Sequence, residues 1–296
     1  NEMLDKYHLG LKVSFPFEQR EQEIIDGCLI LLREYYEQEE FKDRRDFHSV
    51  LALNLKQVSS GMFSGSSLAT VIMPEVESCA EDAFSNSLVQ NCYFPKLERA
   101  AANSFYNCKI KELNCGNFPA LEAIGRAGFS HCPIASATAP QLIIIGDDAF
   151  QNCQQLSAAS FPHVARIGNN SFGHCLTMKH FSAPKLEKIG KWGFYRCQQL
   201  NTLVCDLEPE KFVCEFAITY NEKCCCLTCS GRLVECLKRG KIFKYAEHLK
   251  MASRIQRQLM ASVCQLQKDQ VGEHNYAVQM WKEFEMVKNT VELEQK

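Results

Sequence analysis

The sequence predicts an α+β protein in which short parallel strands stack into a solenoid, with a capping helix before the stack and helices after it. The first observation is a phenylalanine that returns every 21 to 24 residues, at 63, 84, 105, 129, 150, 172 and 194. A unit of about 22 residues is too short to bury its own apolar side, so the copies must stack and share one core. The second observation is hydrophobic spacing typical of helices on both flanks of this region, from Phe17 to about Phe47 and from about Gly231 onward.

Each copy carries its side chains in the same order. A strand-like segment ends at a proline, and the phenylalanine follows ten residues later; the prolines are 74, 95, 119, 140, 162 and 184. Proline ends a strand because it cannot donate to the ladder, and the Ile-Gly pair of the later copies permits a tight bend. We therefore expect ladders of Phe, Cys, Leu and Ile inside the stack. The residue before each proline slot should also point inward: Met73, Phe94, Phe118, Ala139, Phe161, Ala183 and Cys205.

The copy from Phe150 to Phe172 reads AFQNCQQLSAASFPHVARIGNNSF, that is, F-x-x-C-x-x-L followed by h-x-h-P-x-h-x-x-I-G-x-x-A-F. On these residues the chain resembles the BspA-type leucine-rich repeat family over residues 51–205. The first two copies lack the Cys and the Gly. The copy between Phe105 and Phe129 has two extra residues near Cys115 and Gly116, where we expect a bulge. The resemblance implies a leucine-rich-repeat-like, protein-binding solenoid with no catalytic residue, of a kind found in adhesive surface proteins and in intracellular scaffolds.

The pattern divides the chain into four parts. These are an N-terminal helical cap (1–50), a solenoid of about seven repeats (51–205), a Cys-rich C-terminal cap (206–230) and C-terminal helices (231–296). The cap is expected to close the open end of the stack, which would otherwise expose the core. A docking helix for a partner protein is the alternative for the same segment.

Composition places the chain among soluble globular proteins, with 46% hydrophobic residues and a net charge of −2, and argues against a nucleic-acid partner. No apolar run is long enough to predict a transmembrane segment. Side chains on adjacent rungs lie nearly 5 Å apart at Cβ, whereas a disulfide needs about 3.8 Å. The repeat cysteines are therefore expected to be free thiols, which favours a cytoplasmic location, with the cell surface or secretion as the alternative. These cysteines are 108, 132, 153, 175 and 197.

No catalytic site and no cofactor are expected. His131 precedes Cys132 and His174 precedes Cys175, but both histidines fill a slot that holds Asn or Arg elsewhere, which indicates a polar turn position. Cys226 and Cys229 have zinc-ligand spacing without a second pair. They are weak candidates for a structural zinc site, and disulfides or free thiols remain open for this segment.

The segment 238–268 predicts a basic helix, because eight Lys and Arg are opposed by Glu247 alone and an apolar stripe runs beside them. Such a helix could contact an acidic protein or a membrane surface. Packing of its stripe within the chain is the interpretation we favour.

The outward strand positions carry no charge in the rows that we compared, whereas an exposed sheet normally carries Lys or Glu. They predict a non-catalytic protein-interaction module or scaffold that binds a protein partner along the strand face; a plain solvated face is the alternative. A second interpretation is a structural part of a cytoskeletal or ciliary assembly attached through the C-terminal helices, and a third is a secreted or surface adhesin. The candidate partner-binding residues are Ile72, Tyr93, Asn117, Thr138, Ser160, His180, Ser182 and Val204.

Overall fold

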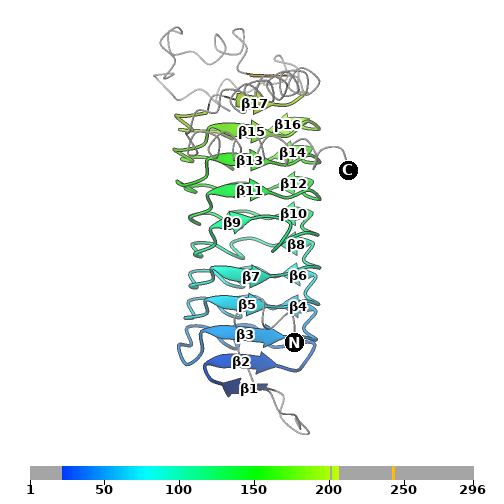
Figure 1. The fold of residues 1–296 in the computed structure, drawn as a ribbon, viewed down its shortest axis with the longest axis vertical. Helices are drawn as coiled ribbons and strands as arrows, with labels where there is room; N and C mark the ends of the chain where they lie inside the picture. Colours follow the sequence, from blue (N-terminus) through cyan, green and yellow to red (C-terminus); the bar gives the residue numbers. More distant parts are fainter. Residues whose placement is uncertain (1–21, 201, 207–241, 244–296) are drawn as a thin grey trace, which may run out of the picture.

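The computed structural model describes residues 22–200, 202–206 and 242–243, which form a stack of rungs with two columns of strands (Figure 1). The first column begins as a five-stranded sheet: β1 (Gln22–Ile25), β2 (Cys28–Leu31), β3 (Ser49–Ala52), β5 (Thr70–Ile72) and β7 (Asn91–Tyr93). It continues as a six-stranded sheet: β9 (Glu112–Leu113), β11 (Ser136–Thr138), β13 (Ala158–Ser160), β15 (His180–Ser182), β17 (Thr202–Val204) and β18 (Ile242–Phe243).

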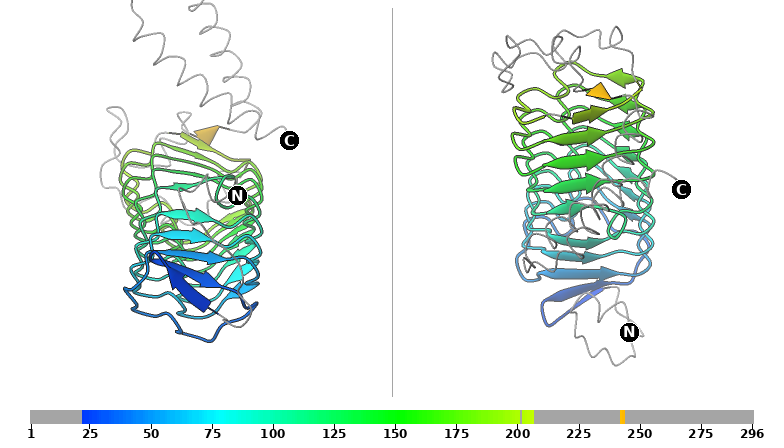
Figure 2. Two further views of the ribbon diagram at one scale, coloured as in Figure 1. Left: turned by 60° about the horizontal axis from the view of Figure 1, so that its bottom comes forward. Right: turned by 45° about the horizontal axis from the view of Figure 1, so that its top comes forward.

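The second column is a seven-stranded sheet of two-residue strands. Its members are β4 (Gln57–Val58), β6 (Ser78–Cys79), β8 (Arg99–Ala100), β10 (Ala123–Ile124), β12 (Ile144–Ile145), β14 (Arg166–Ile167) and β16 (Lys188–Ile189). Neighbouring strands pair in parallel in both columns; the antiparallel pair formed by β1 and β2 closes one end of the stack (Figure 2). This is the predicted solenoid of short parallel strands.

A ladder of phenylalanine rings fills the core between the two columns. Eight rings, from Phe41 to Phe194, stack with centroids 5.0–5.9 Å apart and interplanar angles of 5–13°. That spacing follows the separation of hydrogen-bonded strands, so each ring contacts its counterpart one rung away. The predicted Phe ladder is confirmed, and so is the burial of the seven inward residues from Met73 to Cys205.

The repeat cysteines line the core beside these rings as free thiols. The Sγ atoms of Cys108, Cys132, Cys153, Cys175 and Cys197 each donate a hydrogen bond to the carbonyl oxygen of the phenylalanine one copy earlier, at 3.0–3.2 Å. In an early copy Ser66 Oγ donates to Phe63 O at 2.8 Å. The slot therefore holds a small side chain that can donate.

Turns flank each core phenylalanine at two left-handed positions, two residues before it and two residues after it. Asp, Asn and Gly tolerate this conformation best. His131 and His174 occupy it with φ of 62° and 63°, which confirms the polar turn position predicted for them.

The prediction of an N-terminal capping helix is wrong for residues 22–47. The chain forms β1 and β2 there, and then a further rung whose ring is Phe41, stacked 5.3 Å from Phe63. Both faces of β2 are buried, so its apolar residues run without alternation and imitate helical spacing. The stack thus begins before residue 51, and the described residues contain no helix.

The Cys-rich cap (206–230) and the C-terminal helices (231–296) lie almost entirely outside the described residues. Within them, Ile242 and Phe243 form β18 and pair in parallel with Leu203 and Val204, so the predicted basic helix 238–268 is wrong at these two positions. The division of the chain into four parts stays a prediction.

Candidate protein-binding face

Three consecutive strands bring six of the outward residues into two aligned rows. Parallel pairing places Ser136 beside Ala158 and His180, and Thr138 beside Ser160 and Ser182. We call these six residues the small-residue face. The side chains are uncharged or, for His180, weakly basic. Ser136 and His180 are exposed, whereas Ser182 is only 7% exposed.

The environment of His180 favours its neutral form. Burial lowers the pKa of its imidazole below the ordinary value, and the ammonium of Lys179 lowers it further. The imidazole is therefore mostly uncharged at neutral pH. Two exposed lysines lie near the ends of the first row. Lys179 precedes His180, and Lys111 precedes Glu112, the residue paired with Ser136.

Asn117 does not lie on this face. The two-residue insertion forms a turn from Asn114 to Asn117 and interrupts the sheet between β7 and β9. The carboxamide of Asn117 is used inside this turn: Nδ2 donates to Glu112 O at 2.7 Å, and Oδ1 accepts from Asn114 N at 2.8 Å. In the other row, the strand position beside Ser136 belongs to exposed Glu112, so a charge borders the face at this end.

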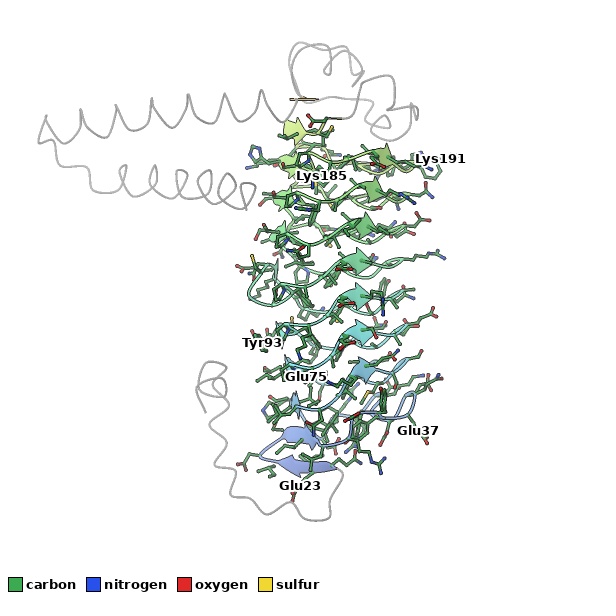
Figure 3. The ribbon with its side chains drawn as sticks, turned by 90° about the vertical axis from the view of Figure 1, so that its right-hand side faces the viewer. Glu23, Glu37, Glu75, Tyr93, Lys185 and Lys191 are labelled. Carbon is green, nitrogen blue, oxygen red and sulfur yellow. The ribbon has the colours of Figure 1, made fainter. Side chains whose placement is uncertain are left out.

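Three other candidates lie on the outward side at the two ends. Ile72 and Val204 are only 1% and 2% exposed, and Tyr93 is half-buried. Tyr93 packs on a separate apolar cluster formed by Cys28, Ile30, Leu51 and Ile72. Figure 3 shows Tyr93 and Lys185 on one side of the stack, away from Glu37 and Lys191 on the other. The structure thus groups Thr138, Ser160, His180 and Ser182, and β17 adds buried Val204 beside Ser182. It separates Ile72, Tyr93 and Asn117 from them.

The adjacent histidines and cysteines face opposite ways. Cys132 Sγ donates to Phe105 O inside the core, whereas His131 is exposed, with Nε2 lying 3.2 Å from Asn152 Nδ2. Burial raises the pKa of the Cys132 and Cys175 thiols well above the ordinary value. A thiol held protonated and turned away from its neighbouring imidazole is not an activated nucleophile.

Metal ligands of the usual kinds do not gather in the described part of the chain, where no group of three or more His, Cys, Asp and Glu could hold an ion. Cys226 and Cys229 lie outside it. Among the described residues, no helix is long and apolar enough to cross a membrane.

Several solved structures are similar to this chain. A leucine-rich repeat protein of T. pallidum has 18% identity and a TM-score of 0.43, covering 64% of this chain and 91% of its own. One from Eubacterium ventriosum has 12% identity and a TM-score of 0.41, covering 62% and 69%. A leucine-rich cell surface protein of Faecalibacterium prausnitzii has 18% identity and a TM-score of 0.33, covering 67% and 56%. No curated protein matches the chain.

The family comparison covers most of the stack. The model of the BspA type leucine-rich repeat region matches in six copies, over residues 35–135 and 122–211. These ranges join into one span that takes in more than half of the 296 residues. The chain belongs to the BspA-type leucine-rich repeat family.

Proposed function

We propose that this chain is a non-catalytic interaction module that binds a protein partner on the small-residue face of β11, β13 and β15. Leucine-rich repeats commonly mediate protein–protein interaction, and this family indicates no catalytic class. The observation that carries the proposal is the alignment of Ser136, Ala158 and His180 with Thr138, Ser160 and Ser182 on three paired strands. Outer strand faces usually carry lysine or glutamate, but neither of these two rows contains one.

The physical properties of this face suit a protein surface as partner. Apart from His180 its side chains are short, so a partner can approach the strands closely, and its hydroxyl groups both donate and accept hydrogen bonds. The strands beneath are fixed by ladder hydrogen bonds and by the Phe stack, so little conformational freedom is lost on binding. Many small contacts can then produce useful affinity.

The location of the protein belongs to the same proposal. Free repeat thiols favoured the cytoplasm, but burial raises the pKa of Cys153 to about 12, and a protonated, enclosed thiol resists oxidation in any compartment. The cysteines therefore support the cell surface or a secreted location as well as the cytoplasm. A role in a cytoskeletal or ciliary assembly would act through residues 231–296, and no described contact favours it.

A matched pair of serine substitutions tests the face. Ser160 on β13 and Ser78 on β6 are both half-buried outward strand residues, on different columns of the stack. Ser160→Glu should abolish the recovery of partners that the wild-type chain retains from a native lysate, measured by quantitative mass spectrometry. Ser78→Glu should retain them. Equal retention by both variants would place the contact on another surface.

A further inference from the structure

The last described turn of the stack holds bulky residues at both left-handed positions. Earlier copies have small or polar residues two positions before the core phenylalanine: Gly61, Asp82, Asn103, Ala127, Asp148 and Asn170. They also have small or polar residues two positions after it: Gly65, Asn86, Asn107, His131, Asn152 and His174. In the last copy these positions are Trp192 and Arg196, with φ of 57° and 59°. A bulky side chain in this conformation strains the backbone, so local folding favours neither residue.

The indole of Trp192 lies at the surface. It is 48% exposed, whereas Phe194 of the same turn is 1% exposed and belongs to the core. Tryptophan, tyrosine and arginine are the residue types that most often dominate the binding energy of protein interfaces. All three types occur within this one turn, as Trp192, Tyr195 and Arg196. Their combination indicates a contact surface for a partner.

Tyr195 fixes part of this surface in advance. Its amide donates a hydrogen bond to Trp192 O at 2.9 Å, and its ring meets the imidazole of His174 edge-on, with centroids 5.3 Å apart. The guanidinium carbon of Arg196 lies 5.4 Å from the centroid of the same ring. A cation that is already held over a ring loses less freedom when a partner binds it.

Positive charge surrounds the turn. Lys191 and Arg196 are exposed within it, and exposed Lys188 of β16 precedes it. Figure 3 shows Lys191 at the side of the stack opposite Tyr93 and Lys185. The ion pairs formed within the described part of the chain involve none of these three cations. Residues 188–205 contain no carboxylate side chain, so the local charge calls for an acidic partner.

The same edge of the stack limits the size of that partner. The positions equivalent to Lys191 and Trp192 are Asp147 and Asp148 two rungs earlier, roughly 10 Å away. An extended polyanion, such as a membrane surface or a nucleic-acid strand, would meet these carboxylates along the edge. A short acidic peptide segment contacts the last turn alone and avoids them.

We propose that residues 191–196, which we call the Trp192 turn, form a second contact site that binds a short acidic segment of a partner protein. The indole packs against apolar side chains of the segment, and Arg196 and Lys191 pair with its carboxylates. The Trp192 turn follows the second column of strands, whereas the small-residue face belongs to the first. The assignment therefore does not depend on the partner of that face, which Ser160→Glu tests separately.

Two substitutions test the site without endangering the fold. Trp192→Asn and Arg196→Asn restore the residue that other copies hold at the same positions, so each variant should be at least as stable as the wild type in urea denaturation. The probe is a fluorescein-labelled peptide made of three repeats of Glu-Ala-Glu-Leu, and its binding is followed by fluorescence anisotropy at low ionic strength. Each substitution should raise the Kd at least about fivefold, because each removes one anchor of the contact.

The matched control is Arg126→Asn, which removes the same charge three rungs earlier on the same edge, where Arg126 Nε lies 3.7 Å from Asp148 Oδ2. It should leave the Kd within about twofold. Failure of the wild-type chain to bind the peptide, or an equal loss in all three variants, would overturn the proposal. A lower urea midpoint for Trp192→Asn would also overturn it, because the indole would then serve packing within the chain. Binding of phosphatidylserine vesicles or oligothymidylate that depends on Trp192, in place of the peptide, would assign the turn to another class of partner and overturn it too.

Discussion

At the scale of single residues, the core cysteine combines two properties that no other small side chain offers together. Its thiol is apolar enough to lie against stacked rings, and it still donates to the carbonyl of the preceding phenylalanine, as Cys153 does to Phe129 O at 3.2 Å. Burial raises its pKa to about 12, which keeps it protonated in the folded chain. The inward position was predictable from the repeat. The acceptor was not, because it lies 24 residues away.

This pKa predicts how stability depends on pH. The thiol of the unfolded chain loses its proton near pH 9, whereas folded Cys153 keeps it to about pH 12. Its contribution is fully present below pH 9, and the free energy of unfolding falls by about 1.4 kcal/mol per pH unit between the two values. Urea denaturation at pH 9 and 10.5 should show a shallower loss for Cys153→Ser by about that slope. Lysines and tyrosines ionise in both proteins, so equal slopes would contradict the assignment.

At the scale of one rung, the repeated shape depends on how closely the backbones of adjacent bends approach each other. The Ile-Gly pair was predicted to permit a tight bend, but Gly125, Gly146, Gly168 and Gly190 do not adopt the left-handed conformation. A Cβ on Gly168 would lie 2.5 Å from Gly146 C and from Asp147 N, which are backbone atoms of the neighbouring rung. The missing side chain therefore serves stacking, a contact that the spacing of one copy does not reveal.

Gly168→Ala should therefore destabilise the stack strongly, by more than about 3 kcal/mol, since backbone on both rungs must shift. Gly116→Ala is the control. Its Cβ would meet a side-chain atom of half-buried Asn114 at 3.0 Å, whereas the neighbours of Gly168 include backbone atoms, so its cost should stay within about 0.5 kcal/mol. Urea denaturation followed by circular dichroism measures both. Similar midpoints for the two variants would show that the close approach carries no energetic weight.

The elements that sequence patterns misassigned share one physical cause, which is a departure from half-buried alternation. Strand β2 is buried on both faces and has no polar alternate, so its apolar residues matched a helix. Asn117 was assigned to a strand by counting back from Pro119, but the insertion moved that position into a turn. Regular copies such as β13 and β15 were placed in register, because their spacing leaves one solution.

At the scale of the molecule, stability is built from contacts between neighbouring rungs. Each phenylalanine ring stacks on the rings directly before and after it, and exposed ion pairs join adjacent copies, as Glu75 does with Lys56 at 3.0 Å and Lys96 at 2.8 Å. Such pairs contribute little by themselves, so the shared core is the main source of stability. The repeat count from Phe63 to Phe194 followed from the sequence. The added rung at Phe41 did not, because Tyr36 stands where the other copies hold Val, Cys, Ala or Ile.

A stack held by neighbours should tolerate the loss of one whole rung but not of half a rung. Deletion of residues 151–172 joins Phe150 to Gly173 and restores the F-x-x-C order with Cys175, so β11 can pair with β15 in the register that β13 now uses. We expect native circular dichroism per residue and a moderate fall in the urea midpoint.

Deletion of residues 151–161 removes β13 but keeps the following bend. It leaves Phe172 half a turn of the solenoid from Phe150 and puts polar turn residues where the core ring belongs. That variant should not fold cooperatively. Equal midpoints for the two deletions would mean that the rungs do not act as the units of stability.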